Sequence, residues 1–153
     1  MIIYIIERMY RMSTVSVSTG TLYIKQDSGD PIVWSVDGDA WNTPTWPITI
    51  VNTDTSISIR VLFVTDLVIN DPNQYFICAS NMIQFGDTTL REDGARYTCT
   101  VDGVPNYPGL IKNGTDSSAG FSNIYIYNIG VIGPNMDGWV MAFLDMEEQR
   151  IVL

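Results

Sequence analysis

The chain has 153 residues, of which 46% are apolar and 16% charged, and it carries a formal net charge of −9. This balance fits one folded domain with a hydrophobic core, and it excludes a disordered chain or an ionic coiled coil. The absence of histidine excludes Ser-His and Cys-His catalysis and histidine-ligated zinc, while the negative charge argues against a nucleic-acid partner.

The first six residues form an apolar run that is followed at once by Glu7, Arg8 and Arg11. A signal peptide has its positive charge before the apolar run and small residues after it, so none is predicted here. We interpret the segment as a packed strand or a short amphipathic element, unless translation begins at Met12. No apolar run approaches the roughly 20 residues of a membrane-spanning helix, so no span is predicted.

Residues 13–26 alternate small polar with apolar side chains, which is typical of a hairpin-like pair of strands. Residues 28–47 are rich in turn residues and contain Trp34, Trp41 and Trp46. We interpret residues 1–47 as an N-terminal cap in which the tryptophans fold across an open end of the core. The alternative is that Trp41 and Trp46 are exposed and stack on sugar rings, as in a carbohydrate-binding module.

Five short β-runs follow, and each of them ends in Asn or Asp. Residues four and two positions before each terminal Asn or Asp share one face of the strand, because side chains alternate with period two. Asn and Asp tolerate the left-handed backbone region and suit a bend between strands. The predicted structural bends are Asn52, Asp66, Asn81, Asp102 and Asn128.

Repeated short strands closed by such bends favour a short right-handed parallel β-helix, a solenoid of about four or five coils over residues 48–139. Cys78 and Cys99 occupy the same place in two of the runs, so we expect them to stack as buried free thiols. The spacing of the bends is uneven, and this keeps an antiparallel β-sandwich or jelly roll open as the alternative.

Residues 75–87, 101–114 and 120–131 each resemble one coil of a known group of proteins. Together, and within residues 30–139, they are similar to uncharacterised right-handed parallel β-helix proteins from multicopy families of giant DNA viruses. The resemblance implies a fold, and it implies no catalytic residue. The tail, residues 140–153, has a different composition. It is either a capping segment of one or two helical turns or the end of a truncated or frame-shifted family member.

Candidate chemistry is sparse in this single β domain of residues 1–153. Asp37 and Asp39 flank Gly38 and are the candidate catalytic carboxylates of a polysaccharide-acting enzyme. The run Asn52-Thr53-Asp54 resembles one motif of β-helix polygalacturonases without its partner motifs, so we interpret it as a bend. No metal site and no cofactor are predicted.

The composition and the resemblance together predict a non-enzymatic structural or surface-interaction protein, associated with a virion or located in the host cytoplasm. The alternatives are the polysaccharide-acting enzyme and the carbohydrate-binding module. An uncovered end of a solenoid exposes strand edges, so we expect self-association through the C-terminal end or contact with other virion proteins.

Overall fold

The computed structural model describes residues 13–17, 20–51, 58–80, 82–89, 92–105, 107, 109–113, 123–133, 143–145 and 150–152. These residues form strands, turns and bends, and no helix occurs among them. The strands are β1 (Ser13–Ser16), β2 (Thr21–Lys25), β3 (Val33–Ser35), β4 (Ile48–Val51), β5 (Ile59–Phe63), β6 (Leu67–Ile69), β7 (Phe76–Ala79), β8 (Met82–Gly86), β9 (Tyr97–Val101), β10 (Ile111–Asn113), β11 (Asn123–Tyr127), β12 (Ile129–Ile132), β13 (Phe143–Asp145) and β14 (Arg150–Val152).

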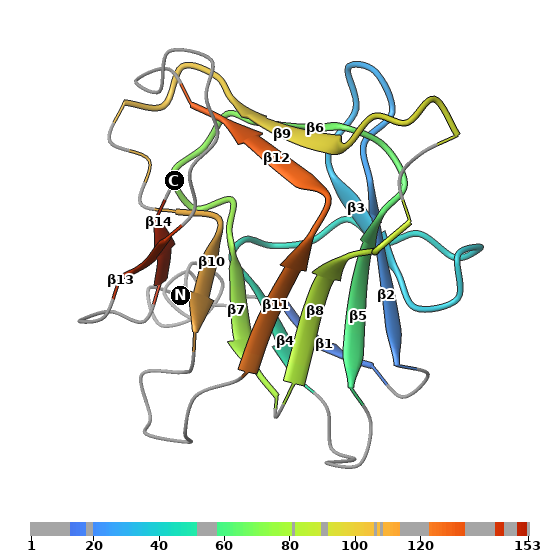
Figure 1. Ribbon diagram of the computed structural model, residues 1–153. Helices are drawn as coiled ribbons and strands as arrows, with labels where there is room; N and C mark the ends of the chain where they lie inside the picture. The colour runs from blue at the N-terminus through green and yellow to red at the C-terminus, as the bar shows by residue number, and fades with distance from the viewer. Residues whose placement is uncertain are drawn as a thin grey trace, which may run out of the picture.

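The strands form three sheets, and most strands from β1 to β9 lie beside the third strand after them; β3 is the exception (Figure 1). The parallel series are β1-β4-β7-β10, β2-β5-β8-β11 and β6-β9-β12. Antiparallel pairs occur in the described part of the chain only at the margins, between β2 and β3, β10 and β14, and β13 and β14. The predicted all-β class is therefore confirmed, and most of the pairing is parallel rather than that of an antiparallel sandwich.

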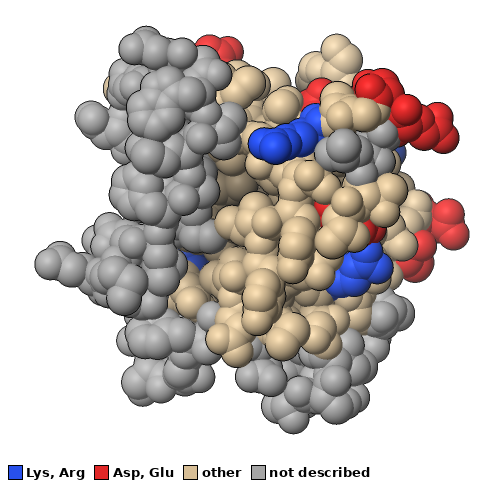
Figure 2. Space-filling model, viewed as in Figure 1, with Lys and Arg blue, Asp and Glu red and all other residues tan. Residues whose placement is uncertain are grey.

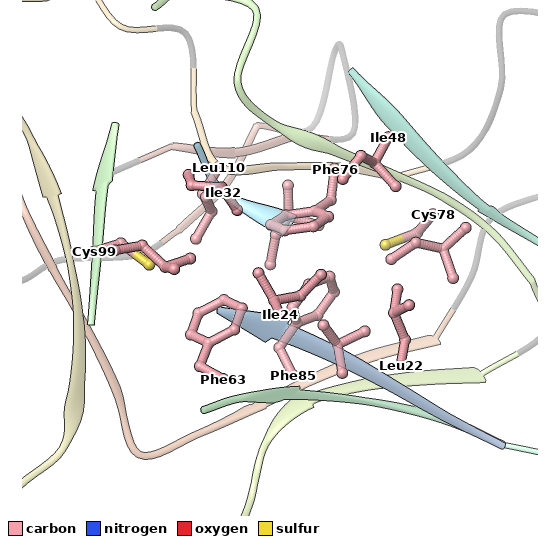
Figure 3. Close-up of a cluster of buried hydrophobic side chains, with 14 of the residues drawn as sticks. Leu22, Ile24, Ile32, Ile48, Phe63, Phe76, Cys78, Phe85, Cys99 and Leu110 are labelled. Carbon is pink, nitrogen blue, oxygen red and sulfur yellow. The ribbon is translucent and has the colours of Figure 1, made fainter. Parts of the chain in front are cut away.

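The core lies between the sheets and is filled from alternate positions of their strands. In β2, β4 and β5 every second side chain is buried, as the period-two rule requires. Figure 3 shows Phe76 of β7 at the centre of this cluster. Its ring lies 5.5 Å from the ring of Phe85, 6.4 Å from that of Phe63 and 5.6 Å from that of Trp46. Phe76 therefore links the sheet of β7 to the sheet of β5 and β8.

The predicted hairpin over residues 13–26 is wrong in its pairing, although both strands exist. β1 pairs with β4 and β2 pairs with β5, so the two strands belong to different sheets. Gly20 between them has a φ of 83°, a backbone conformation that glycine adopts without strain. The chain therefore turns a corner between two sheets at Gly20, and the antiparallel partner of β2 is β3.

The predicted alignment of the five β-runs is wrong, because the runs are distributed over three sheets, and even β4 and β7, which share a sheet, are offset by one residue. Ile50 of β4 lies beside Cys78 of β7, and not beside Ala79 as the alignment requires. A shift of one residue exchanges the two faces of a strand. The aligned Val64 and Ile126 do not share a row either, because Ile126 lies in the row of Phe85 and Val61.

The bends fall where the structure turns from one sheet to the next. Asp66 lies between β5 and β6, Asp102 follows β9, and Asn128 separates β11 from β12. Of these three bends, only Asn128, with a φ of 53°, adopts the left-handed region predicted for them; Asp66 and Asp102 bend the chain without it. Asn52 and Asn81 lie outside the described residues.

The tail differs from the predicted helical cap. Its described residues form β13 and β14, an antiparallel pair, and β14 continues the sheet beside β10. The tail therefore covers the edge of one sheet with strands. The N-terminal segment of residues 1–12, for which a strand or an amphipathic element was predicted, lies outside the described residues.

Candidate functional site

Asp37, a predicted catalytic carboxylate, holds together the loop that follows β3. Its Oδ1 accepts hydrogen bonds from the Ser35 hydroxyl at 2.8 Å, the Asp39 amide at 2.8 Å and the Ala40 amide at 2.9 Å. The backbone N–H groups of Ala40 and Asp39 and the Ser35 hydroxyl together lower the pKa of Asp37 to about 2. A general acid needs a raised pKa, so these contacts favour a loop-forming role.

Asp39, the second predicted carboxylate, is exposed and enters this loop through its backbone amide. Ser35 is fully buried, and its hydroxyl also accepts a hydrogen bond from the Gly38 amide at 2.9 Å. The sequence Ser-Val-Asp-Gly-Asp is thus a compact turn anchored by a buried serine.

Trp46, a predicted sugar-binding residue, packs against the core rather than standing on the surface. Its ring meets Phe76 edge-on at an interplanar angle of 74°, and Trp34 packs against the same core cluster. These are the contacts that a cap over the core end would make. Trp41 is partly exposed, and the Nζ of Lys25 lies 4.5 Å from its ring centre, in cation–π geometry.

An open hollow of about 390 Å³ lies between the turn after β2 and strand β6. Gln26 spans it, because its Oε1 accepts the Val68 amide at 2.7 Å and its Nε2 donates to the Asp30 carbonyl at 3.1 Å. Asp27 and Asp66 add carboxylates to its lining. Within the described segments no group of three His, Cys, Asp or Glu side chains is placed to hold a metal ion.

Cys78 and Cys99 are free and buried, as predicted. Burial raises the pKa of both thiols far above the ordinary value, which suppresses the reactive thiolate. The predicted stacking of the two cysteines is wrong: Cys78 pairs with Ile50 in one sheet and Cys99 with Leu67 in another. Figure 3 shows the two sulfur atoms on opposite sides of the core.

The corner between β8 and β9 holds a second set of polar contacts. Arg60 Nη2 lies 2.6 Å from Asp87 Oδ2, and Asn128 Nδ2 donates to the Asp87 carbonyl at 2.7 Å. The Thr89 amide first, and the Arg60 guanidinium in addition, lower the pKa of Asp87. The cavity beside these residues measures about 30 Å³, room for one water molecule, so this corner joins strands and offers no substrate site.

The clearest candidate for an interaction surface is formed by β11 (Asn123–Tyr127) and β12 (Ile129–Ile132), the last described strands of their sheets, and we call it the β12 end. Ile126 of β11 continues the inward row of Leu22, Val61 and Phe85. Those three side chains are fully buried, whereas Ile126 is 38% exposed, and among the described strands β11 is the last of its sheet. Tyr125 and Tyr127 are 46% and 36% exposed.

Figure 2 views the molecule from the side on which β11 lies in front. The described part of this face is largely free of acidic and basic side chains, which gather toward its margins. No site was predicted at β11 from the sequence. The sequence Asn123–Tyr127 does indicate an unusual strand: isoleucine on one face and tyrosine on the other make both faces apolar.

The sequence matches no family model, and comparison with curated proteins and with solved structures found no similar protein. The resemblance to viral β-helix proteins therefore stays a prediction from sequence. Within the residues described by the structure, no helix is long and apolar enough to cross a membrane.

Proposed function

We propose that the chain is a short right-handed parallel β-helix with a non-enzymatic, structural role, and that it acts by associating with a second copy of itself through the β12 end. The parallel pairing of strands that lie three apart in the chain, in all three sheets, supports the fold. A chain that makes three strands and then returns beside the first of them generates a coil with three faces. Connections between parallel strands of one sheet are right-handed in about 98% of cases, which gives the proposed hand.

The observation that carries the proposed role is the exposure of Ile126. It is an inward-pointing residue of a continuous core row, and its neighbours in that row are fully buried. Full burial of such a side chain stabilises a protein by roughly 1.5–3 kcal/mol. Apolar core residues that are exposed to solvent at the last strand of a parallel series favour contact with another protein surface.

The strand edges support the same conclusion. Among the described residues, β11 and β12 are the last strands of their sheets, whereas β10 is followed by β14. Unpaired edges of this kind are templates for another strand. Two adjacent open edges and a partly exposed core row make the β12 end a docking face.

The contacts of the predicted site residues favour this role over the two carbohydrate-based alternatives. A polysaccharide-acting enzyme needs one carboxyl group held protonated, and the pKa of Asp37 is lowered to about 2. A sugar platform needs a free aromatic face, and Trp46 packs against Phe76. The resemblance to viral proteins adds the proposal that the assembly belongs to a virion, which recovery of the chain in purified particles would test.

The test is sedimentation velocity of the wild type and of two matched variants, from about 1 to about 500 µM protein, a range set by micromolar association. Ile126→Lys places a charge on the proposed contact. Val68→Lys is the control, since Val68 is a 42% exposed strand residue on β6, at the other end of its sheet from β12.

Wild type and Val68→Lys should form a dimer with the same dissociation constant, and that of Ile126→Lys should rise at least about tenfold. A wild-type chain that stays monomeric over the whole range would overturn the proposal. An equal effect of both substitutions would also overturn it, because the β12 end would then have no special part.

A further inference from the structure

We propose that the two copies meet across a two-fold axis, with β11 of one copy pairing antiparallel with β11 of the other. This geometry deepens the proposed function and rests on it. It predicts a closed dimer, whereas stacking of the β12 end of one copy on the opposite end of the next would produce a filament.

The first argument is that the opposite end of the sheet of β11 is already closed. The last strand there is β3, and the loop after it returns to bridge Trp34 with Asn42. The Trp34 amide donates to the Asn42 carbonyl at 3.0 Å, and the Asn42 amide donates to the Trp34 carbonyl at 2.9 Å. The outward hydrogen-bonding groups at the centre of β3 are therefore used within the chain, and β11 of another copy cannot pair there.

The sheet of β12 is closed in a similar way at its opposite end. Its last strand there is β6, whose central residue is Val68. The Val68 amide donates to the side chain of Gln26 at 2.7 Å. The chain thus places its own polar groups on both β3 and β6, and head-to-tail stacking through these two sheets is blocked.

The second argument is the self-complementarity of β11. If the antiparallel pair is centred on Tyr125, the two Tyr125 residues face each other. Ile124 of each copy then faces Ile126 of the other. The inward faces of both strands would then continue the rows of Ile83 and Phe85 into the second copy. Close cross-strand contact between aromatic and between β-branched side chains is favourable in antiparallel pairs.

The third argument is electrostatic. Each copy carries a net charge of −9, so two copies repel one another over most orientations. β11 contains no charged residue, and the described face that carries it is largely free of acidic side chains (Figure 2). The electrostatic repulsion between two copies is therefore smallest when they approach through β11. A basic partner would find no acidic side chain on β11 to attract it.

The experiment is disulfide cross-linking of Tyr125→Cys in the full chain with diamide as oxidant. Directly opposed residues of an antiparallel pair have Cβ atoms about 4.5–5.5 Å apart, close to the distance that a disulfide spans. The native Cys78 and Cys99 are buried and do not compete for the reagent. Tyr125 is 46% exposed in the single chain, so its replacement leaves the fold intact.

Gln84→Cys is the matched control. Gln84 lies directly beside Tyr125 on β8, one strand further from the proposed axis. With strands about 4.8 Å apart, the two Gln84 positions of a dimer lie roughly 14 Å from each other, beyond disulfide reach. A double variant, Asn123→Cys with Tyr127→Cys, tests the register, because these two positions oppose each other between the copies.

We expect Tyr125→Cys to convert most of the protein to a covalent dimer, and Gln84→Cys to give less than about one tenth of that yield. Equal cross-linking of both variants would overturn the two-fold pairing. A wild type that sediments as a dimer, with no cross-link at Tyr125, would refute the β11 geometry and leave self-association standing. A wild type that is monomeric throughout would refute both.

Discussion

Replacing Gly86 by alanine should destabilise the protein through a clash between neighbouring strands. Gly86 ends β8, has a φ of 80° and lies beside Tyr127 of β11. A Cβ atom built there overlaps the carbonyl oxygen of Tyr127 and lies 3.0 Å from its carbonyl carbon and 3.1 Å from Cγ1 of Ile129. Because the first two contacts are with backbone, they cannot be relieved by a side-chain rotation.

The size of the effect follows from two contributions. The left-handed conformation costs an alanine about 1–2 kcal/mol relative to glycine. Relief of the overlap requires β11 to move away from β8, which weakens several interstrand hydrogen bonds worth about 0.5–1.5 kcal/mol each. The free energy of unfolding should therefore fall by about 3–5 kcal/mol, in the range of severe single substitutions.

Gly94→Ala is the control for the backbone strain alone. Gly94 has a φ of 76°, and a Cβ atom there has no neighbour within 4 Å. Its cost should be about 1–2 kcal/mol. The difference between the two variants isolates the contact between β8 and β11.

Equilibrium urea unfolding, followed by the fluorescence of the 4 tryptophans, measures both variants. With a slope of about 2 kcal/mol per molar urea, Gly86→Ala should lower the midpoint by about 2 M and Gly94→Ala by less than about 1 M. Equal midpoints would refute the close approach of the two strands, and with it the placement of β11 on β8.

Four further outcomes follow from the structure. The carboxyl group of Asp37 should titrate near pH 2 in carbon-detected NMR, and because its folded pKa lies below the ordinary 3.8, its stabilisation of the loop should be complete above about pH 4 and be lost as the pH falls toward 2; a titration near pH 4 would contradict the hydrogen bonds. Cys78 and Cys99 should react with a maleimide only after unfolding, since burial raises the pKa of both thiols; fast labelling of the native chain would contradict their burial. Asn128→Ala should cost about 1–2 kcal/mol in urea unfolding, as it forces alanine into a φ of 53°, and Asn128→Gly should cost less. Phe76→Ala should cost about 3–5 kcal/mol, because it empties the centre of the core, and a loss below about 1 kcal/mol would show that the aromatic cluster is not formed.

The sequence predicted the strand class, and at one bend the backbone conformation, because both are local properties. Asn128 illustrates this: its side chain tolerates the left-handed region, and the structure gives it a φ of 53°. The register between neighbouring strands was harder to predict from the sequence. In β7 the residues Phe76, Ile77 and Cys78 are all buried, so alternation alone does not reveal which face points to the core.

The hairpin prediction failed for a related reason. Alternation in residues 13–26 correctly indicates two strands, but the partner of each strand is set by long-range packing. Gly20 directs β2 into another sheet, where it lies beside β5, more than thirty residues later in the chain. Pairing over such a separation leaves no mark in the local pattern.

The roles of individual polar residues were also beyond the sequence. Asp37 and Asp39 were paired by their spacing, yet the spacing serves a turn in which one carboxylate accepts the other residue's amide. A short acidic motif is compatible with both roles, and only the hydrogen bonds distinguish them.

The two ends of the strand stack differ in a way that bears on assembly. At one end the chain bonds its own polar groups to β3 and β6, through Asn42 and Gln26. At the other end β11 keeps an apolar strand with partly exposed core residues. A stack with two open ends would polymerise, because each end would accept the next copy. In the sheet of β11 one end is bonded within the chain and β11 is the last described strand at the other, so this sheet can pair only once, and the proposed two-fold dimer would leave no further edge in it.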